Sequence, residues 1–119
     1  MKTDAVYLRH ILDAIQQIHT YTLEGKTTFL NDRKTQDAVL RNIEIIGEAA
    51  KRVSPEFKTR TADLPWKQIA GMRDKVIHDY FGVNLQLVWE TTQGSMRMLA
   101  QRLEPILREL DQQRTLPLP

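Results

Sequence analysis

Four segments of the chain carry apolar residues at intervals of three and four positions, and this spacing constrains the fold more than any other feature. The segments are residues 4–24, 33–53 and 65–81, and a last one that begins after Asn84. Such spacing places the apolar side chains on one face of an α-helix, which has about 3.6 residues per turn. The sequence therefore predicts four long amphipathic helices. Their apolar positions are Leu8, Ile11, Leu12, Ile15 and Ile18, then Val39, Ile43, Ile46, Ala50 and Val53, then Trp66, Ile69, Met72, Val76 and Ile77, and finally Leu85, Val88, Trp89, Met96, Leu99 and Leu103.

Short connections separate these segments, and helices joined in this way pack as antiparallel neighbours. The sequence therefore predicts an all-α fold, a mainly antiparallel bundle of four to five helices. The number depends on Pro105, which either kinks the fourth helix or starts a further one. Residues 1–112 are expected to form a single domain, since the chain is close to the commonest domain size. Residues 113–119 lack a core pattern and are expected to form a frayed tail.

Residues whose side chains accept backbone N–H bonds indicate where the helices begin. Two glycines suit the left-handed conformation that ends a helix, Gly25 for the first helix and Gly82 for the third. A short turn is predicted at residues 27–32. A loop is predicted at residues 54–64, because Pro55 disfavours helix for the residue before it. The expected caps are Thr3 or Asp4 for the first helix, Asn31 or Asp32 for the second, and Asn84 for the fourth.

The composition narrows the kind of protein. No cysteine is present, which excludes disulfides and thiolate metal sites and suits a reducing cytoplasm. No stretch approaches the ~20 apolar residues of a membrane span. The first residues, Met1–Asp4, lead directly into the amphipathic pattern and do not resemble a signal peptide. We therefore expect a soluble, cytoplasmic protein that has no membrane partner.

The charge distribution gives a weaker signal about partners. The formal charge of +2 is too small to indicate a nucleic-acid partner. Between Lys51 and Lys75, however, seven basic residues stand against three acidic ones, a local excess of four positive charges. Such an excess favours an anionic partner. A solvated basic face explains it equally well, so both interpretations stay open.

The segment from Arg73 to Tyr80 carries the residues best suited to chemistry. Arg73 follows Ile69 by four positions, so it lies on or beside the apolar stripe, where an arginine is costly unless it is paired or lines a cleft. Tyr80 lies about 20° from Arg73 around an ideal helix, but His78 lies about 140° away. A straight helix in a monomer therefore does not bring Arg73 and His78 to one phosphate. A two-fold dimer that pairs the third helices would place two copies of each around one cleft.

Arginine, histidine and tyrosine together suit the cleavage of an RNA phosphodiester. A base must remove the proton of the 2′-hydroxyl group, and histidine, with a reference pKa of about 6.5, suits that role at His78. Arg73 stays charged and can donate two parallel bonds to phosphate oxygens. Tyr80 can position the phosphate. The alternative is a structural arginine–aspartate pair with a histidine at the helix end, next to the C-terminal dipole.

No metal site or cofactor is predicted. Glu44 and Glu48 lie one helical turn apart, but a di-metal bundle site also needs Glu-x-x-His pairs from other helices. The two glutamates are more typical of a polar helix face that pairs with Lys51 or Arg52. His10 and His19 have no second ligand at metal spacing, so we expect them at the surface or at the edge of the core.

The pattern Arg73-x4-His78-x-Tyr80 resembles the signature of HepT-like toxins of the HEPN superfamily, which are encoded beside a minimal nucleotidyltransferase antitoxin. The resemblance covers nearly the whole chain, since residues 7–12 and 41–52 are similar to the first two helices of that family and residues 64–83 to its motif helix. It implies a HEPN-like all-α bundle that dimerises through the motif helix. It also implies a metal-independent endoribonuclease in which Arg73 and His78 are the catalytic pair.

The resemblance further implies how such a toxin is controlled. The cognate nucleotidyltransferase antitoxin would transfer AMP to Tyr80, and a bulky anionic adduct there would block the entry of phosphate. Asp79 is a candidate for orienting the imidazole of His78, and Asp74 is a second supporting candidate. The expected partners are an RNA substrate, with tRNA and mRNA both open, the antitoxin and a second copy of the chain.

Two other kinds of protein fit the same sequence. The first is a non-catalytic subunit that binds the substrate of a nucleotidyltransferase, which would bind its partner but cleave no RNA. The second is a simple helical interaction module, in which changes at Arg73–Tyr80 would alter only stability.

Overall fold

The fold is all-α, as predicted. A computed structural model describes residues 2–78 and 84–115, and it describes the backbone alone at residues 2, 73, 75–78 and 113–115. No strand occurs in these ranges. The helices are α1 (Lys2–Tyr21), α2 (Lys26–Asn31), α3 (Arg33–Arg52), α4 (Pro55–Arg60), α5 (Trp66–His78), α6 (Leu85–Gln93) and α7 (Ser95–Thr115).

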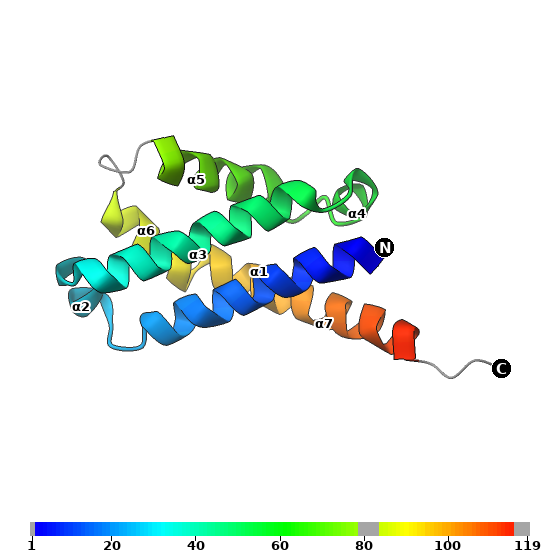
Figure 1. Cartoon of the computed structure of the whole chain (residues 1–119), viewed down its shortest axis with the longest axis horizontal. Coiled ribbons are helices and arrows are strands. Elements are labelled where there is room, and N and C mark those ends of the chain that lie inside the picture. Colours follow the sequence, from blue (N-terminus) through cyan, green and yellow to red (C-terminus); the bar gives the residue numbers. More distant parts are fainter. Residues whose placement is uncertain (1, 79–83, 116–119) are drawn as a thin grey trace.

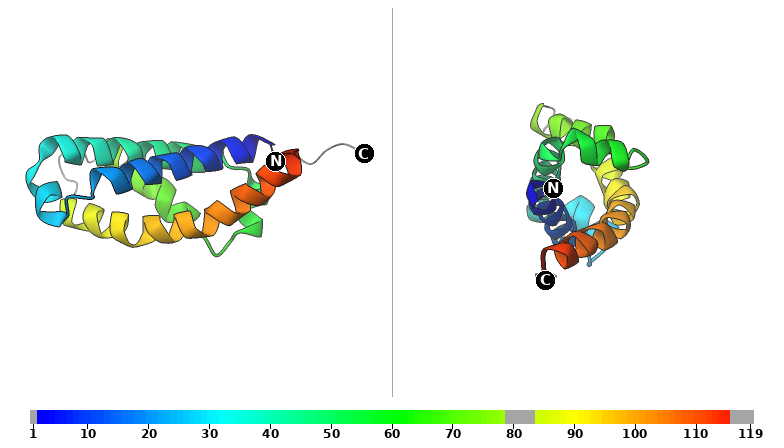
Figure 2. Two further views of the ribbon diagram at one scale, coloured as in Figure 1. Left: turned by 90° about the horizontal axis from the view of Figure 1, so that it is seen from below. Right: turned by 90° about the vertical axis from the view of Figure 1, so that its right-hand side faces the viewer.

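The long helices form an antiparallel bundle with α3 between two neighbours. Figure 1 shows α1 and α5 on opposite sides of α3, each running in the direction opposite to it. Helices α6 and α7 follow one another along a second layer, and α7 packs against α1 (Figure 2). The result is an elongated molecule of 56 × 26 × 20 Å. Of the described residues, no helix is long and apolar enough to cross a membrane.

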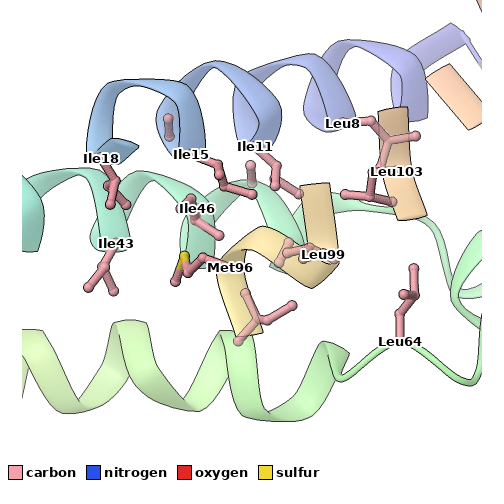
Figure 3. Close-up of a cluster of buried hydrophobic side chains, with 14 of the residues drawn as sticks. Leu8, Ile11, Ile15, Ile18, Ile43, Ile46, Leu64, Met96, Leu99 and Leu103 are labelled. Carbon is pink, nitrogen blue, oxygen red and sulfur yellow. The ribbon is translucent and has the colours of Figure 1, made fainter. Parts of the chain in front are cut away.

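The predicted apolar stripes form the core of the bundle. Figure 3 shows Leu8 and Ile11 of α1 facing Leu99 and Leu103 of α7, and all four side chains are almost completely buried. Each such side chain contributes about 1.5–3 kcal/mol to stability by leaving water. Four predicted stripe residues are half-buried and pack at the edge of the core, and the side chains of residues 76 and 77 lie outside the description. The half-buried four are Leu12, Met72, Leu85 and Trp89.

The start of α1 differs from the prediction. The helix already includes Lys2, so neither Thr3 nor Asp4 is its cap. Asp4 is instead 2% exposed, and its carboxylate accepts hydrogen bonds from the backbone N–H (2.8 Å) and the hydroxyl (2.7 Å) of Ser54. The prediction failed because a short polar residue near a helix start satisfies distant donors as well as local ones.

The predicted loop at residues 54–64 is wrong over half its length, because it contains α4. Ser54 caps this helix by accepting a bond from Phe57 N–H (3.2 Å), and Pro55 is its first residue. Proline is well tolerated there, since the first turn of a helix has free N–H groups in any case. The side chain of Phe57 is buried, which holds the short helix against the bundle.

The other connections largely match their predictions. The prediction for Gly25 is wrong, because α1 already ends at Tyr21 and Gly25, with a φ of 97°, is instead the N-cap of α2. The turn predicted at residues 27–32 forms the short helix α2, in which the side chain of Phe29 is buried. Asp32 and Asn84 cap α3 and α6 as expected, through bonds from Lys34 N–H and Leu87 N–H. The glycine expected to end the third helix, Gly82, lies outside the described residues.

The break in the last long segment lies at Gly94 and not at Pro105. Helix α7 runs through Pro105, so the proline does not start a further helix. Because Pro105 has no N–H group, the carbonyl of Gln101, four residues earlier, loses its usual helical partner. Both residues are exposed, so water can bind to this carbonyl. Helix α7 continues to Thr115, three residues past the predicted domain limit, and residues 116–119 lie outside the description.

Candidate functional site on helix α5

Helix α5 begins at a fixed point in the structure. The indole of Trp66, its first residue, is buried and donates a hydrogen bond to the hydroxyl of Thr61 (3.1 Å). The same ring packs edge to face on Phe57 of α4, with ring centres 6.1 Å apart. Ile69 and Met72 then continue the apolar face toward the core. These contacts set where α5 starts and which side of it faces inward.

Both members of the predicted catalytic pair lie on α5. The backbone of Arg73 is in the second half of the helix, and His78 is its last residue. Because the helix is continuous between them, the two residues differ by about 140° in direction and about 7.5 Å along the axis. Their side chains lie outside the description. Asp79 and Tyr80, the other two residues predicted for the site from this segment, also lie outside the described residues.

Asp74 forms a contact that the sequence did not predict. Its carboxylate accepts a charged hydrogen bond from Lys51 Nζ of α3 at 2.7 Å. The predicted pairing of the Glu44 and Glu48 face with Lys51 or Arg52 is confirmed for Glu48, which lies beside Arg52 (3.6 Å). Glu44 lies near Arg41 (3.8 Å). Lys51 and Asp74 are 23 positions apart in the chain, so no helical spacing in the sequence indicates that they pair.

The connection before α5 is tied to the opposite layer. The guanidinium group of Arg102, on α7, donates a hydrogen bond to the carboxylate of Asp63. This bond lowers the pKa of Asp63 below its ordinary value of 3.8. Both side chains are about half exposed, so the pair contributes little to stability. Its effect is to join residues 61–65 to α7 at the end of the bundle where α5 begins.

A polar groove of about 410 Å³ lies between α1 and α3. Glu44 and Glu48 each lie beside an arginine of the same helix, so the groove carries both signs of charge. The exposed ring of His10 packs edge-on against Tyr7, with centres 6.1 Å apart, and His19 is also exposed. This confirms the surface positions expected for both histidines. The groove is lined by Tyr7, His10, Arg41, Glu44, Ile45, Glu48, Ala49 and Arg52.

A second groove, of about 400 Å³, separates α5 from α6 and α7. Its α5 side includes Ile69 and Met72, the turn just before Arg73. Leu87 and Met98, two large apolar residues that are 45% and 64% exposed, lie one turn from lining residues of the same groove. The flank of α5 that faces away from α3 is therefore open and apolar. The full lining is Pro65, Gln68, Ile69, Met72, Thr91, Ser95, Met96 and Leu99.

The described residues contain no group of three or more histidine, aspartate or glutamate side chains that could hold a metal ion. Part of the predicted basic excess is neutralised locally, because Lys51 and Arg52 each lie beside a carboxylate. Arg60 and Lys67, which flank the start of α5, are exposed.

Comparison with known proteins identifies related chains. The model of a protein family described as "Ribonuclease HepT-like" matches residues 11–106, a range that includes all of α5. A protein of Thermococcus cleftensis named "Probable ribonuclease HepT" is 43% identical over 101 residues, which cover 84% of this chain and 92% of that protein. A "Putative RNase" of Caldanaerobacter subterraneus subsp. tengcongensis is 41% identical over 113 residues, 92% of this chain and 98% of that protein.

A third relative is longer. A protein of Methanocaldococcus jannaschii named "Gamma-glutamylcyclotransferase and putative RNase" is 43% identical over 107 residues. These residues cover 89% of this chain and 48% of that protein, so the chain spans about half of its length. No solved structure matches the chain significantly.

Proposed function

Because the chain belongs to the HepT-like ribonuclease family, we propose that it is the toxin of a toxin–antitoxin pair and cleaves RNA internally, without a metal ion, through Arg73 and His78. The observation that carries the proposal is the family match at residues 11–106, because it contains the whole helix on which both residues lie. The exposed bases Arg60 and Lys67 beside the start of α5 suit an anionic substrate.

The proposed reaction is an internal transfer at phosphorus. Neutral His78 takes the proton of a 2′-hydroxyl group, and the oxygen attacks the adjacent phosphorus atom. The bond from phosphorus to the 5′-oxygen of the next nucleotide breaks, and that oxygen takes a proton from water as it leaves, after which protonated His78 returns its proton to the solvent. The products are a 2′,3′-cyclic phosphate and a 5′-hydroxyl end. Arg73 donates two parallel bonds to the phosphate oxygens and stabilises the extra negative charge of the phosphorane.

The active unit in this proposal is a homodimer. On a continuous helix Arg73 and His78 point about 140° apart, so one copy of α5 does not direct both at the same phosphate. A two-fold axis beside α5 brings Arg73 of one protomer next to His78 of its partner, and it creates two equivalent sites. The open, apolar flank of α5 is compatible with a neighbouring chain at this helix.

Tyr80 is the proposed point of control. In this proposal its phenol oxygen attacks the α-phosphorus of ATP, bound by a cognate nucleotidyltransferase antitoxin, and pyrophosphate leaves. The adenylate adds bulk and negative charge two residues from His78, which excludes a second phosphate by repulsion. The toxin is then inactive although it remains folded.

Cleavage of RNA by the purified protein in the presence of a chelator tests the proposal. Arg73→Ala and His78→Ala should each lower the rate by at least about 100-fold, the usual contribution of an acid–base group or a charge-stabilising donor. Arg97→Ala on α7 and His19→Ala on α1, both exposed and far along the chain from α5, are the matched controls and should cleave normally. Helical content and oligomeric state should be unchanged in all four.

The result also separates the competing functions. Cleavage that persists in both Arg73→Ala and His78→Ala would overturn the catalytic assignment. A wild-type protein that cleaves no RNA but binds the nucleotidyltransferase tightly would instead indicate a non-catalytic, substrate-binding subunit.

Intact-mass measurement after co-expression with the antitoxin tests the control step. The wild-type chain should gain one adenylate, and Tyr80→Phe should gain none. Tyr21→Phe, which alters an exposed tyrosine on α1, is the control and should be modified like the wild type. A fully inhibited complex that contains only unmodified toxin would contradict this mode of regulation.

A further inference from the structure

Helix α5 is held along one side only. Within the described part of the chain, α3 is the one helix with extensive contact to α5 (Figure 1). The opposite side of α5 borders the apolar groove toward α6 and α7. The rotation of α5 about its own axis is therefore set by its contact with α3 and by the anchored ring of Trp66 at its start.

The Lys51–Asp74 ion pair lies where this rotation affects the site. Lys51 comes from α3, and Asp74 is the residue directly after Arg73. The distance from Lys51 Nζ to Asp74 Oδ1 is 2.7 Å. Asp74 lies near the middle of α5, well after the buried ring of Trp66 at its start. On the α3 side, Gly47, one turn before Lys51, is buried.

We propose that Lys51 is a positioning residue: through Asp74 it fixes the rotation of α5 and so aims Arg73 at one active site of the proposed dimer and His78 at the other. The inference rests on the proposed ribonuclease function. A small rotation of α5 moves the two side chains together, because both are on the same rigid helix. Displacing reacting groups by about 1 Å can lower a rate by up to about 100-fold, so even a weak ion pair has a large effect at this point.

This role differs from direct contact of Lys51 with RNA. If Lys51 only attracted the substrate, removal of its charge would raise KM, and removal of the carboxylate of Asp74 would not slow the reaction. If Lys51 acts through Asp74, either change breaks the same tie and lowers kcat. The effects of the two changes are then not additive.

A double-mutant cycle on full-length protein tests the proposal, with RNA cleavage as the readout. Lys51→Met and Asp74→Asn should each lower kcat about tenfold with little change in KM, and the double variant should be no worse than either. The exchanged pair Lys51→Asp with Asp74→Lys should recover most of the lost kcat. Arg9→Met is the matched control, since Arg9 and Asp111 form an equally exposed ion pair between α1 and α7.

Hydrogen exchange of the α5 backbone gives a second readout that needs no activity. Exchange across residues 67–78 should be faster in Lys51→Met and in Asp74→Asn than in the wild type or in Arg9→Met. Unchanged kcat in both single variants, or losses that simply add, would overturn the inference while leaving the ribonuclease assignment intact. If the wild type cleaves no RNA, the proposed function fails, and unchanged exchange in α5 would then overturn the positioning role by itself.

Discussion

Asp4 is the most completely buried carboxylate among the described residues, and its surroundings explain why the fold accepts it. Both oxygens accept hydrogen bonds from Ser54, one from the backbone N–H and one from the hydroxyl. Ser54 in turn caps α4. One side chain of α1 therefore orients the residue that starts a helix 50 positions later in the chain.

Replacing Asp4 by asparagine should lower stability by about 2 kcal/mol. The amide oxygen can still accept from the Ser54 N–H, but the NH2 group cannot accept from the Ser54 hydroxyl. That hydroxyl loses its bond to a charged acceptor and must turn to accept from the NH2 group instead. Urea-induced unfolding measures the change. Asp13→Asn, at an exposed position of the same helix, is the control and should stay within about 0.5 kcal/mol of the wild type. An equal effect of both substitutions would show that the contact with Ser54 adds nothing.

At the scale of elements, the sequence predicts what periodicity can encode. The long stripes of α1, α3 and α5 identify the helices and their buried faces, because every third or fourth residue carries the signal. The short helix α4 has too few residues for a period, and Pro55 indicates a break as readily as a first helical turn. The same limit applies to the site. Arg73 and His78 lie on one helix, so the spacing of the sequence relates them. Lys51, which pairs with Asp74, comes from a segment 23 positions away, and no period connects the two.

Two glycines in these elements should respond to alanine in opposite directions. Gly25, at the start of α2, has a left-handed φ of 97°, so Gly25→Ala should cost about 1 kcal/mol of stability. Gly71 lies inside α5, and a Cβ there would meet no atom within 4 Å. Gly71→Ala should therefore stabilise the protein by up to about 1 kcal/mol, through higher helix propensity.

Thermal or urea unfolding of the two variants measures both changes. If Gly71→Ala destabilises the protein, then its position in α5 is covered in solution by a chain that leaves no room for the added methyl group.

At the scale of the whole molecule, α5 is an outer helix of an elongated bundle. It lies against α3 on one side and borders an apolar groove on the other. Leu87 of α6 and Met98 of α7, the two helices across this groove, are exposed. The part of the molecule that carries the proposed site is therefore at its surface. This position suits a site completed by a second copy of the chain, the arrangement that the angle of about 140° between Arg73 and His78 already suggests from the sequence.

Mixing two inactive variants tests whether each site uses residues of both protomers. If Arg73 of one protomer acts with His78 of its partner, a heterodimer of Arg73→Ala and His78→Ala contains one intact site. Random exchange of subunits should then restore about a quarter of the wild-type rate, because half of the dimers are mixed and each has one of its two sites. RNA cleavage after mixing measures the recovery. No recovery, with subunit exchange verified, would place both residues of a site in the same protomer.

The packing of α7 on α1 also determines when the protein can finish folding during its synthesis. Arg9 and Asp111 join these helices from positions 102 residues apart, and Leu8 needs Leu103 to complete its burial. At typical translation speeds the ribosome takes about 5–20 s to make that intervening chain. Until α7 has been made, the side of α1 that packs on α7 in the folded protein stays uncovered. The nascent chain therefore completes its core only as the last helix leaves the ribosome, so a chain interrupted in translation before α7 lacks part of its core.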